Sequence, residues 1–299
     1  MSATRLFGLA LAAASLPAQD PVRLSGPVSG FLFDAPTRAI RVVMGVPGAA
    51  YLGAATLRDI DNGAISPDGR LVLAIAGAAA SLARVGDPAM QPLVNSGCEG
   101  ALAAWAADSS AVAVVCAGRI RLFRAAGGSE VPLAAFTDAT AVAVESGGRR
   151  VFAAAADGVY RVDAEAAQLL APVAGADNLI VSGSTLFVAD RAAGQVLAID
   201  AGSGAAAVRV AATGAGDPVG LAVSPDGTRL HVADGEGKAV KVFDARTGEP
   251  VARVELDFAP ARVDPLGDGL FLVHSRRGAG ESLQILDARR STVSFLPTL

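Results

Sequence analysis

One sequence repeat recurs along this chain. Its clearest copy covers residues 218–256 and reads PVGLAVSPDGTRLHVADGEGKAVKVFDARTGEPVARVEL. Four short apolar runs, rich in small and β-branched residues, alternate there with turn sequences such as SPDG and ARTG. A repeat of about 40 residues with four strands is typical of a β-propeller blade. The repeat therefore predicts an all-β propeller.

The number of blades follows from counting hairpins. The turn between the first and second strands of the repeat is found six times, and the end of the third strand seven times. The extra copy is FLFDAPTRAIRVVMG at 31–45, which we interpret as a third-to-fourth-strand hairpin. We predict seven blades, six complete and one incomplete and N-terminal, with VRLSG as a further strand of the incomplete blade and residues 45–57 as an insertion. A six-bladed ring with an appended hairpin is the alternative.

The N-terminal residues predict export. Arg5 precedes the apolar stretch Leu6 to Leu16, which is too short to span a bilayer but suits a secretory signal, and small residues follow it. We expect a signal peptide over residues 1–18 and one propeller domain over residues 22–299. No other apolar stretch is long enough for a transmembrane helix, so the mature chain is expected in the periplasm or outside the cell.

The chain has two cysteines, Cys98 and Cys116, on either side of one predicted hairpin. In an exported protein such a pair is a candidate disulfide. The hairpin register places Cys116 nearest to Ala101, with Cys98 further out in the entering loop. A bridge is therefore compatible with the pattern but not dictated by it, and two separately buried thiols are the alternative.

A set of carboxylates recurs just before the first strand of six blades. These are Asp59, Glu99, Asp138, Asp177, Asp217 and Asp257. First strands begin around the channel mouth, where converging carboxylates concentrate negative potential and could hold a basic partner or Ca²⁺. Asp residues also satisfy backbone donors in such connections, which is the commoner reason for finding them there. No cofactor is otherwise indicated.

Several function classes find no support. The net charge is −4 and no basic stripe occurs, so nucleic-acid binding is not expected. The nucleophile-elbow, phosphate-loop and zinc-helix motifs are missing. His231 and His274 lie in second strands of neighbouring blades, offset by one residue, and are not expected to share a metal. We identify no catalytic residues.

The best copy of the repeat resembles the YVTN-type repeat of bacterial secreted propellers, and LFVADRAAGQVLAID at 186–200 is similar to the NHL repeat. The SPDG turn is shared with WD-repeat propellers, although the Gly-His and Trp-Asp pairs of WD repeats are missing. The resemblance covers residues 58–297. It implies an exported propeller, often without catalysis, and carries over no catalytic residues.

Propellers host many unrelated activities, so the fold does not name the function. We expect an exported binding module that takes a protein, peptide or small-molecule ligand at its loop-rich, acidic mouth. The alternatives are a metal-dependent, lactonase-like hydrolase at the same mouth and a structural repeat protein of the cell envelope or surface.

Overall fold

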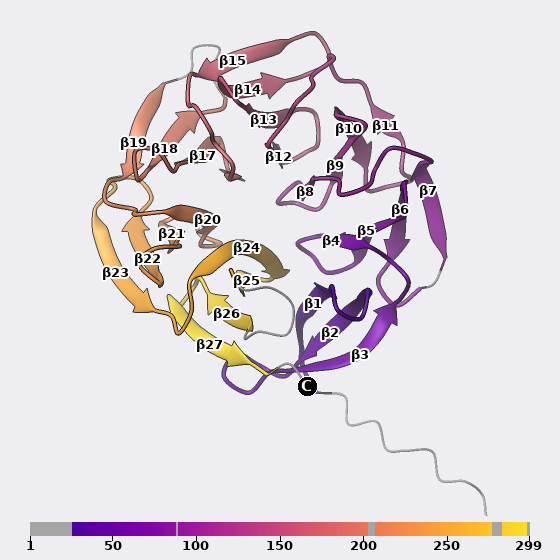
Figure 1. Cartoon of the computed structure of the whole chain (residues 1–299), viewed down its shortest axis with the longest axis horizontal. Helices are drawn as coiled ribbons and strands as arrows, with labels where there is room; N and C mark the ends of the chain where they lie inside the picture. Colours follow the sequence, from indigo (N-terminus) through magenta and orange to yellow (C-terminus); the bar gives the residue numbers. More distant parts are fainter. Residues whose placement is uncertain (1–25, 88, 203–206, 277–282, 298–299) are drawn as a thin grey trace, which may run out of the picture.

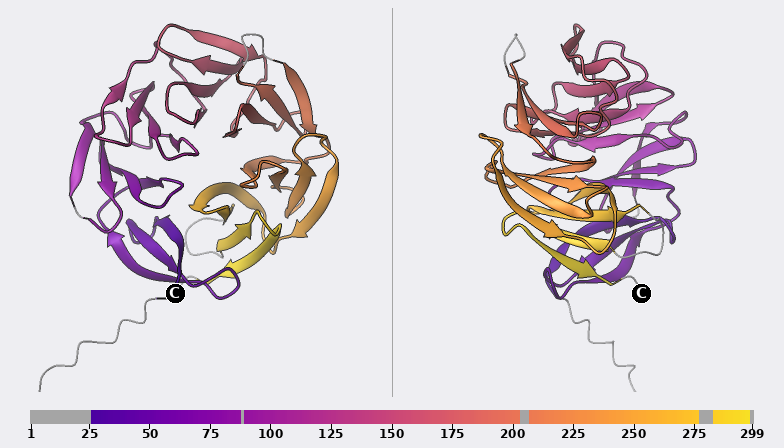
Figure 2. Two further views of the ribbon diagram at one scale, coloured as in Figure 1. Left: turned by 180° about the vertical axis from the view of Figure 1, so that it is seen from behind. Right: turned by 60° about the vertical axis from the view of Figure 1, so that its left-hand side comes forward.

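The computed structural model describes residues 26–87, 89–202, 207–276 and 283–297. These residues form seven antiparallel sheets around one central axis (Figure 1). The chain is therefore a seven-bladed β-propeller, as predicted, and the six-bladed alternative is wrong. The views from behind and from the side show the same ring of sheets (Figure 2). We number the sheets blades 1 to 7 in chain order.

Each complete blade is a four-stranded meander whose first strand lies near the axis and whose fourth lies at the rim. Blades 1 to 3 contain β1 (Val28–Asp34), β2 (Ala39–Met44), β3 (Tyr51–Leu57), β4 (Asn62–Ile65), β5 (Leu71–Ala76), β6 (Ala79–Arg84), β7 (Met90–Val94), β8 (Ala103–Trp105), β9 (Ala111–Cys116), β10 (Arg119–Arg124) and β11 (Glu130–Val131). Blades 4 and 5 contain β12 (Ala141–Val144), β13 (Val151–Ala155), β14 (Gly158–Val162), β15 (Ala167–Ala171), β16 (Leu179–Ser182), β17 (Thr185–Asp190), β18 (Gln195–Asp200) and β19 (Val208–Ala212). Blades 6 and 7 contain β20 (Pro218–Val223), β21 (Arg229–Asp234), β22 (Ala239–Asp244), β23 (Pro250–Glu255), β24 (Pro260–Gly267), β25 (Leu270–Ser275), β26 (Leu283–Asp287) and β27 (Thr292–Leu296).

Blade 1 differs from the expectation in the identity of its strands. The carbonyl of Arg38, in the β1–β2 turn, accepts a hydrogen bond from Ile60 N–H. The carbonyl of Lys238, in the turn between the second and third strands of blade 6, accepts the matching bond from Leu256 N–H. The hairpin at 31–45 is therefore a second-to-third-strand hairpin, and our third-to-fourth interpretation is wrong. Asp ends both kinds of strand in this repeat, so Asp34 did not distinguish them.

The rim strand of blade 1 is β3, which pairs with β2. It lies inside the segment 45–57 that we expected to be an insertion, and that expectation is also wrong. Of the proposed strand VRLSG, residues 22–25 lie outside the described residues. The described part of blade 1 thus has three strands, with β1 as its inner edge.

The core consists of seven apolar clusters, one between each pair of neighbouring blades. Side chains of a strand alternate between the two faces of its sheet. In blade 6, Leu221 and Val223 therefore pack towards blade 5, while Ala222 packs towards blade 7. Gly220 lets β20 approach β24 closely, because a Cβ there would lie 2.6 Å from the Val263 side chain.

Turns between first and second strands are fixed by Ser and Asp side chains. In blade 6, Ser224 Oγ donates to Asp226 Oδ1 at 2.6 Å and accepts from Arg229 N–H at 2.9 Å. Ser66 makes the same pair of bonds in blade 2. The hydrogen bond from Ser224, followed by those from the Thr228 N–H and hydroxyl, lowers the pKa of Asp226 to about 2. The SPDG signal thus has a local structural cause.

A buried histidine joins blades 6 and 7. His231 is 1% exposed, and its Nε2 lies 3.0 Å from Ser291 Oγ. Burial, assisted by the positive charge of Arg229, lowers the pKa of His231 from 6.5 to about 4. The folded protein therefore keeps this imidazole neutral at pH values where the unfolded chain is protonated.

Acid should consequently destabilise the fold through His231. The contribution of the neutral His231 imidazole to the free energy of unfolding is complete above pH 6.5. It is lost as the pH falls towards 4, because the unfolded state takes up the proton first. The loss amounts to about 3 kcal/mol. Urea unfolding of the wild type and His231→Leu at pH 7 and pH 4 should show a smaller pH dependence in the variant. Equal pH dependence in both proteins would contradict this assignment.

Candidate functional site at the channel mouth

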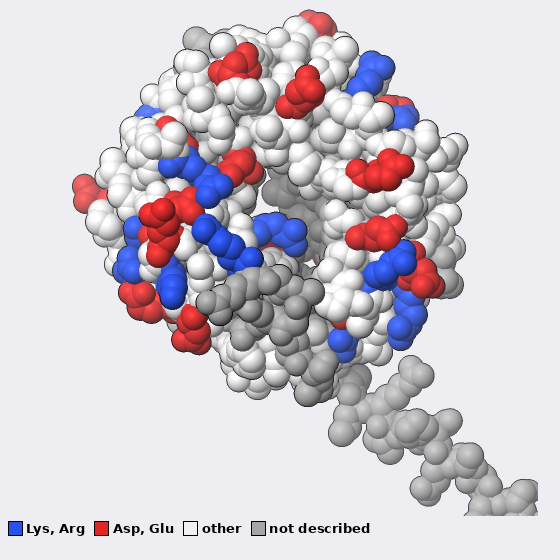
Figure 3. Space-filling view, in the orientation of Figure 1, with Lys and Arg blue, Asp and Glu red and all other residues white. Residues whose placement is uncertain are grey.

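Two kinds of connection share one face of the ring. The loops that enter first strands and the turns between second and third strands lie at the same end of the blades, because successive strands of a meander run in opposite directions. Hydrogen bonds such as Cys98 N–H to Ala78 C=O, at 2.9 Å, connect the two kinds of loop. We call this end the mouth face, and Figure 3 looks onto it.

The six predicted carboxylates occupy these entering loops at different distances from their strands. Asp217 directly precedes β20, whereas three residues separate Glu99 from β8. All except the half-buried Asp217 are exposed. Within the described residues no group of three or more His, Cys, Asp or Glu side chains is placed to hold a metal ion. The carboxylates thus share a face without forming a coordination site there.

Two of the six carboxylates are held by arginines, Asp177 by one of its own blade and Asp217 by two of the neighbouring blades. Arg191 pairs with Asp177 at 2.9 Å and with Asp217 at 2.7 Å, and Arg276 pairs with Asp217 at 2.8 Å. The hydrogen bond from Arg191, helped by that from Arg276, keeps the pKa of Asp217 below its usual range against the effect of burial. This cluster links blades 5, 6 and 7.

Sequence reasoning missed the two arginines. Arg191 directly follows β17 and Arg276 directly follows β25, so both begin the turn after a second strand. Arg38 lies in the corresponding turn of blade 1 and pairs with Asp61, directly before β4, at 2.7 Å. Arg191 and Arg38 thus each pair with an acid at the next blade's entrance, and Arg276 reaches the acid at the preceding blade's entrance.

The remaining four carboxylates are Asp59, Glu99, Asp138 and Asp257. Within the described ranges none of them has an ion-pair partner, and Asp138 accepts only a hydrogen bond from the Thr137 hydroxyl at 3.1 Å. Acids and bases lie close together over β17 to β24, whereas over β8 to β15 the acidic side chains nearer the axis stand apart and the basic ones lie towards the rim, where Arg121 of β10 pairs with Glu130 (Figure 3). The mouth face is therefore electrostatically uneven, with uncompensated negative charge on blades 2 to 4.

The acids that follow second strands have local roles. Asp234 is 2% exposed; it accepts hydrogen bonds from the N–H groups of Asp217 and Gly237 and pairs with Lys241 at 2.8 Å. Asp190 accepts from Ala193 N–H and Gln195, and Asp157 accepts from the Tyr160 hydroxyl. These side chains order the turns that carry the mouth.

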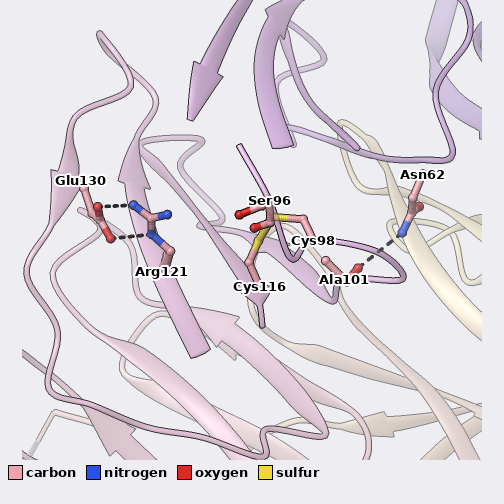
Figure 4. Close-up of a disulfide and its surroundings, with 7 residues drawn as sticks. All are labelled: Asn62, Ser96, Cys98, Ala101, Cys116, Arg121 and Glu130. Carbon is pink, nitrogen blue, oxygen red and sulfur yellow. Dashed lines mark hydrogen bonds and ion pairs between the residues drawn. A yellow bond between two sulfur atoms is a disulfide. The ribbon is translucent and has the colours of Figure 1, made fainter. Parts of the chain in front are cut away.

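A disulfide joins Cys98 to Cys116, whose Cα atoms are 4.3 Å apart (Figure 4). Cys98 lies in the loop entering β8, and Cys116 ends β9. Ala117 N–H also donates to the Gly97 carbonyl, and Asn62 Nδ2 donates to the Ala101 carbonyl at 3.5 Å. The loop that carries Glu99 is thereby tied to its own blade and to blade 2.

The two histidines do not share a site. His231 is buried between blades 6 and 7, whereas His274 Nε2 lies 2.9 Å from Asp264 Oδ2. Trp105 packs into the cluster between blades 2 and 3, and its Nε1–H donates to the Ala64 carbonyl at 2.8 Å.

No protein-family model and no curated protein matches the chain. Among solved structures, Kluyveromyces lactis Hsv2 is similar with a TM-score of 0.56 and 10% identity, covering 76% of this chain and 75% of that one. The β-propeller domain of Cps50 (Swd1) from Myceliophteria thermophila has a TM-score of 0.56 and 14% identity, covering 84% and 94%. A chain of the Mitotic Checkpoint Complex has a TM-score of 0.50 and 20% identity, covering 64% and 63%. These similarities show the fold, a seven-bladed propeller with WD40-like neighbours.

The disulfide should stabilise the blade. Replacing Cys98 and Cys116 together by Ala should lower the free energy of unfolding by about 3 kcal/mol, because their sequence separation is 18 residues. Chemical denaturation of both proteins measures the difference. The oxidised wild type should also react with no thiol reagent after unfolding, and labelling of two cysteines per chain would contradict the bridge.

The ion pair between Arg191 and Asp217 should contribute less to the free energy of unfolding than the disulfide does, because its side chains are partly exposed. Arg191→Ala should lower the free energy of unfolding by about 1 kcal/mol, and a double-mutant cycle with Asp217→Asn should give a coupling of similar size. Asp59→Asn is the matched control and should change stability by less than about 0.5 kcal/mol. Additive effects of the Arg191 and Asp217 substitutions would show that the contact contributes nothing.

Proposed function

We propose that this protein is an exported interaction module that binds a protein or peptide partner on the mouth face of blades 2 to 4. The observation that carries the proposal is the set of exposed carboxylates there, Asp59, Glu99 and Asp138, which lack ion pairs with described residues while Asp177 and Asp217 are neutralised. A partner with basic side chains would supply the missing counter-charges.

The architecture supports a binding role. A propeller presents a rigid ring of short loops on one face, and loops positioned by a rigid scaffold are where binding residues concentrate. The disulfide and the bond from Asn62 to Ala101 fix the loop that carries Glu99. A partner would therefore bind a preformed surface, and binding would cost little free energy for ordering the loops.

Three observations support export. The residues Leu6 to Leu16 have the length and polarity of a secretory signal, although they lie outside the described residues. The disulfide suits an oxidising compartment. The repeat resembles that of bacterial secreted propellers of the YVTN and NHL types. Within the described ranges, no helix has the length and apolarity needed to cross a bilayer.

Charge reversal tests the proposed surface. Mature protein with Glu99→Lys and Asp138→Lys should no longer retain, from an envelope extract, a partner that the wild type retains, and raised salt should weaken the wild-type complex. Glu165→Lys with Glu249→Lys is the control, because these exposed acids lie in turns between third and fourth strands at the other end of the blades. Equal retention by the mouth variant and the control would place the partner elsewhere.

A further inference from the structure

The chain makes a wide loop outside β10, at the mouth end of blade 3. The short strand β11 pairs with Leu122 and Phe123 of β10. The chain meets β10 again at the isolated bridge between Thr137 and Arg119. Between these two pairings, residues 132–136 follow a longer path than β10 does. The outer edge of β10 is therefore paired at both ends, with a loop rather than a strand in between.

Contacts with blade 4 hold this loop away from β10. Ala134 N–H donates to the Asp163 carbonyl of blade 4 at 2.7 Å, and the ring of Phe136 packs against Tyr160 with centroids 5.1 Å apart. Between the loop and β10 lies a cavity of about 590 Å³. The space is thus a product of the fold, because the residues that could fill it are bound to the next blade.

Most of the residues that line the cavity are apolar. Ile120 is buried, and Leu133 and Phe136 are half-buried. Arg121 also lines the cavity, but Glu130 engages its guanidinium through hydrogen bonds of 2.8 and 2.6 Å (Figure 4). The volume and this composition are within the range of sites that bind a small group by burying it.

Two carboxylates of the mouth face, Glu99 and Asp138, flank the cavity. Glu99 follows Cys98, whose disulfide partner Cys116 lines the cavity. Asp138 lies two residues after Phe136, which also lines it. The first carboxylate belongs to the loop that enters blade 3 and the second to the loop that enters blade 4. Since residues of both loops line the cavity, it lies between the two carboxylates that the proposed function uses.

The charge at the cavity favours an aromatic occupant over an acidic one. Arg119 lines the cavity, is exposed and has no ion-pair partner among the described residues. A guanidinium can pair with a carboxylate or stack on an aromatic ring. The carboxylates of Glu99 and Asp138 disfavour a further anion beside them, whereas the apolar lining favours a ring.

We propose that this cavity, the blade 3 pocket, receives an aromatic side chain of the partner, and that basic residues on either side of that side chain pair with Glu99 and Asp138. The inference rests on the proposed function, because it concerns the same partner, and it adds the side chain that anchors it. Aromatic side chains buried in pockets supply much of the binding free energy at protein interfaces. The partner should therefore carry an aromatic residue between basic ones.

The test uses the labelled peptide Gly-Lys-Gly-Trp-Gly-Lys-Gly and fluorescence polarisation with the mature chain. We expect saturable binding, which replacement of the peptide's Trp by Ala weakens about tenfold. Ala135→Phe should weaken binding of the Trp peptide by a similar factor and leave the Ala peptide unaffected, because Ala135 is exposed and lines the pocket. Ala126→Phe is the matched control, since Ala126 is an exposed alanine in the turn after β10, outside the pocket. Melting curves verify that both variants fold.

The remaining outcomes separate the pocket from the mouth face. Absence of saturable binding, equal affinities for the Trp and Ala peptides, tighter binding of a peptide with Glu in the Trp position, or unchanged affinity in Ala135→Phe would overturn the pocket. Glu99→Lys with Asp138→Lys should weaken the binding of both the Trp and the Ala peptide, because charge pairing does not depend on the ring. If this double variant loses affinity while the Trp and Ala peptides bind equally, the pocket is refuted and the mouth face stands. If it retains full, Trp-dependent affinity, the mouth face is refuted and the pocket stands.

Discussion

Packing between blades is the interaction on which this structure depends. Each blade buries both faces of its sheet against its neighbours, in seven separate clusters, so no blade has a core of its own. The chain has only 5% aromatic residues and uses Ala, Val and Leu instead. Small side chains allow close approach of the sheets, as at Gly220 against Val263. Ring closure then requires blade 7 to pack on blade 1, which the cluster of Leu32, Leu266 and Leu272 provides.

Much of the fold could be predicted because residues within each repeat determine its strands and turns. The SPDG turns, the Gly-rich turns and the apolar runs each specify a strand or a hairpin from nearby residues, and the count of seven blades follows from them. Blade 1 shows the limit of this reasoning. Its Asp34 fits the end of a second or a third strand equally well, and only long-range pairing with β3 resolves the difference. The short β11 was equally hidden, because the contacts of Ala134 and Phe136 with blade 4 join residues far apart in the sequence.

The candidate site was predicted in position but not in chemistry. The six carboxylates share a face because first strands all begin there, which the repeat alone determines. Whether a carboxylate is free depends on side chains from neighbouring blades. Arg191 reaches across from blade 5 to Asp217 at the entrance of blade 6, and Arg276 reaches the same group from blade 7. A sequence read one blade at a time has no means of pairing them.

The proposed binding face rests on a difference between exposed acids at the mouth face and the turns at the other end of the propeller. In the turns between first and second strands, Asp68 N–H donates to Ser109 Oγ at 3.0 Å, and the Asp108 carboxylate accepts from Gly147 N–H at 2.7 Å. Those turns hold consecutive blades together, so their polar groups are already engaged. At the mouth face, Asp59 and Glu99 are exposed without such contacts to described residues. An exposed carboxylate without an ion pair to described residues is free to pair with a basic group of a partner, and the proposed function depends on this property of Asp59 and Glu99.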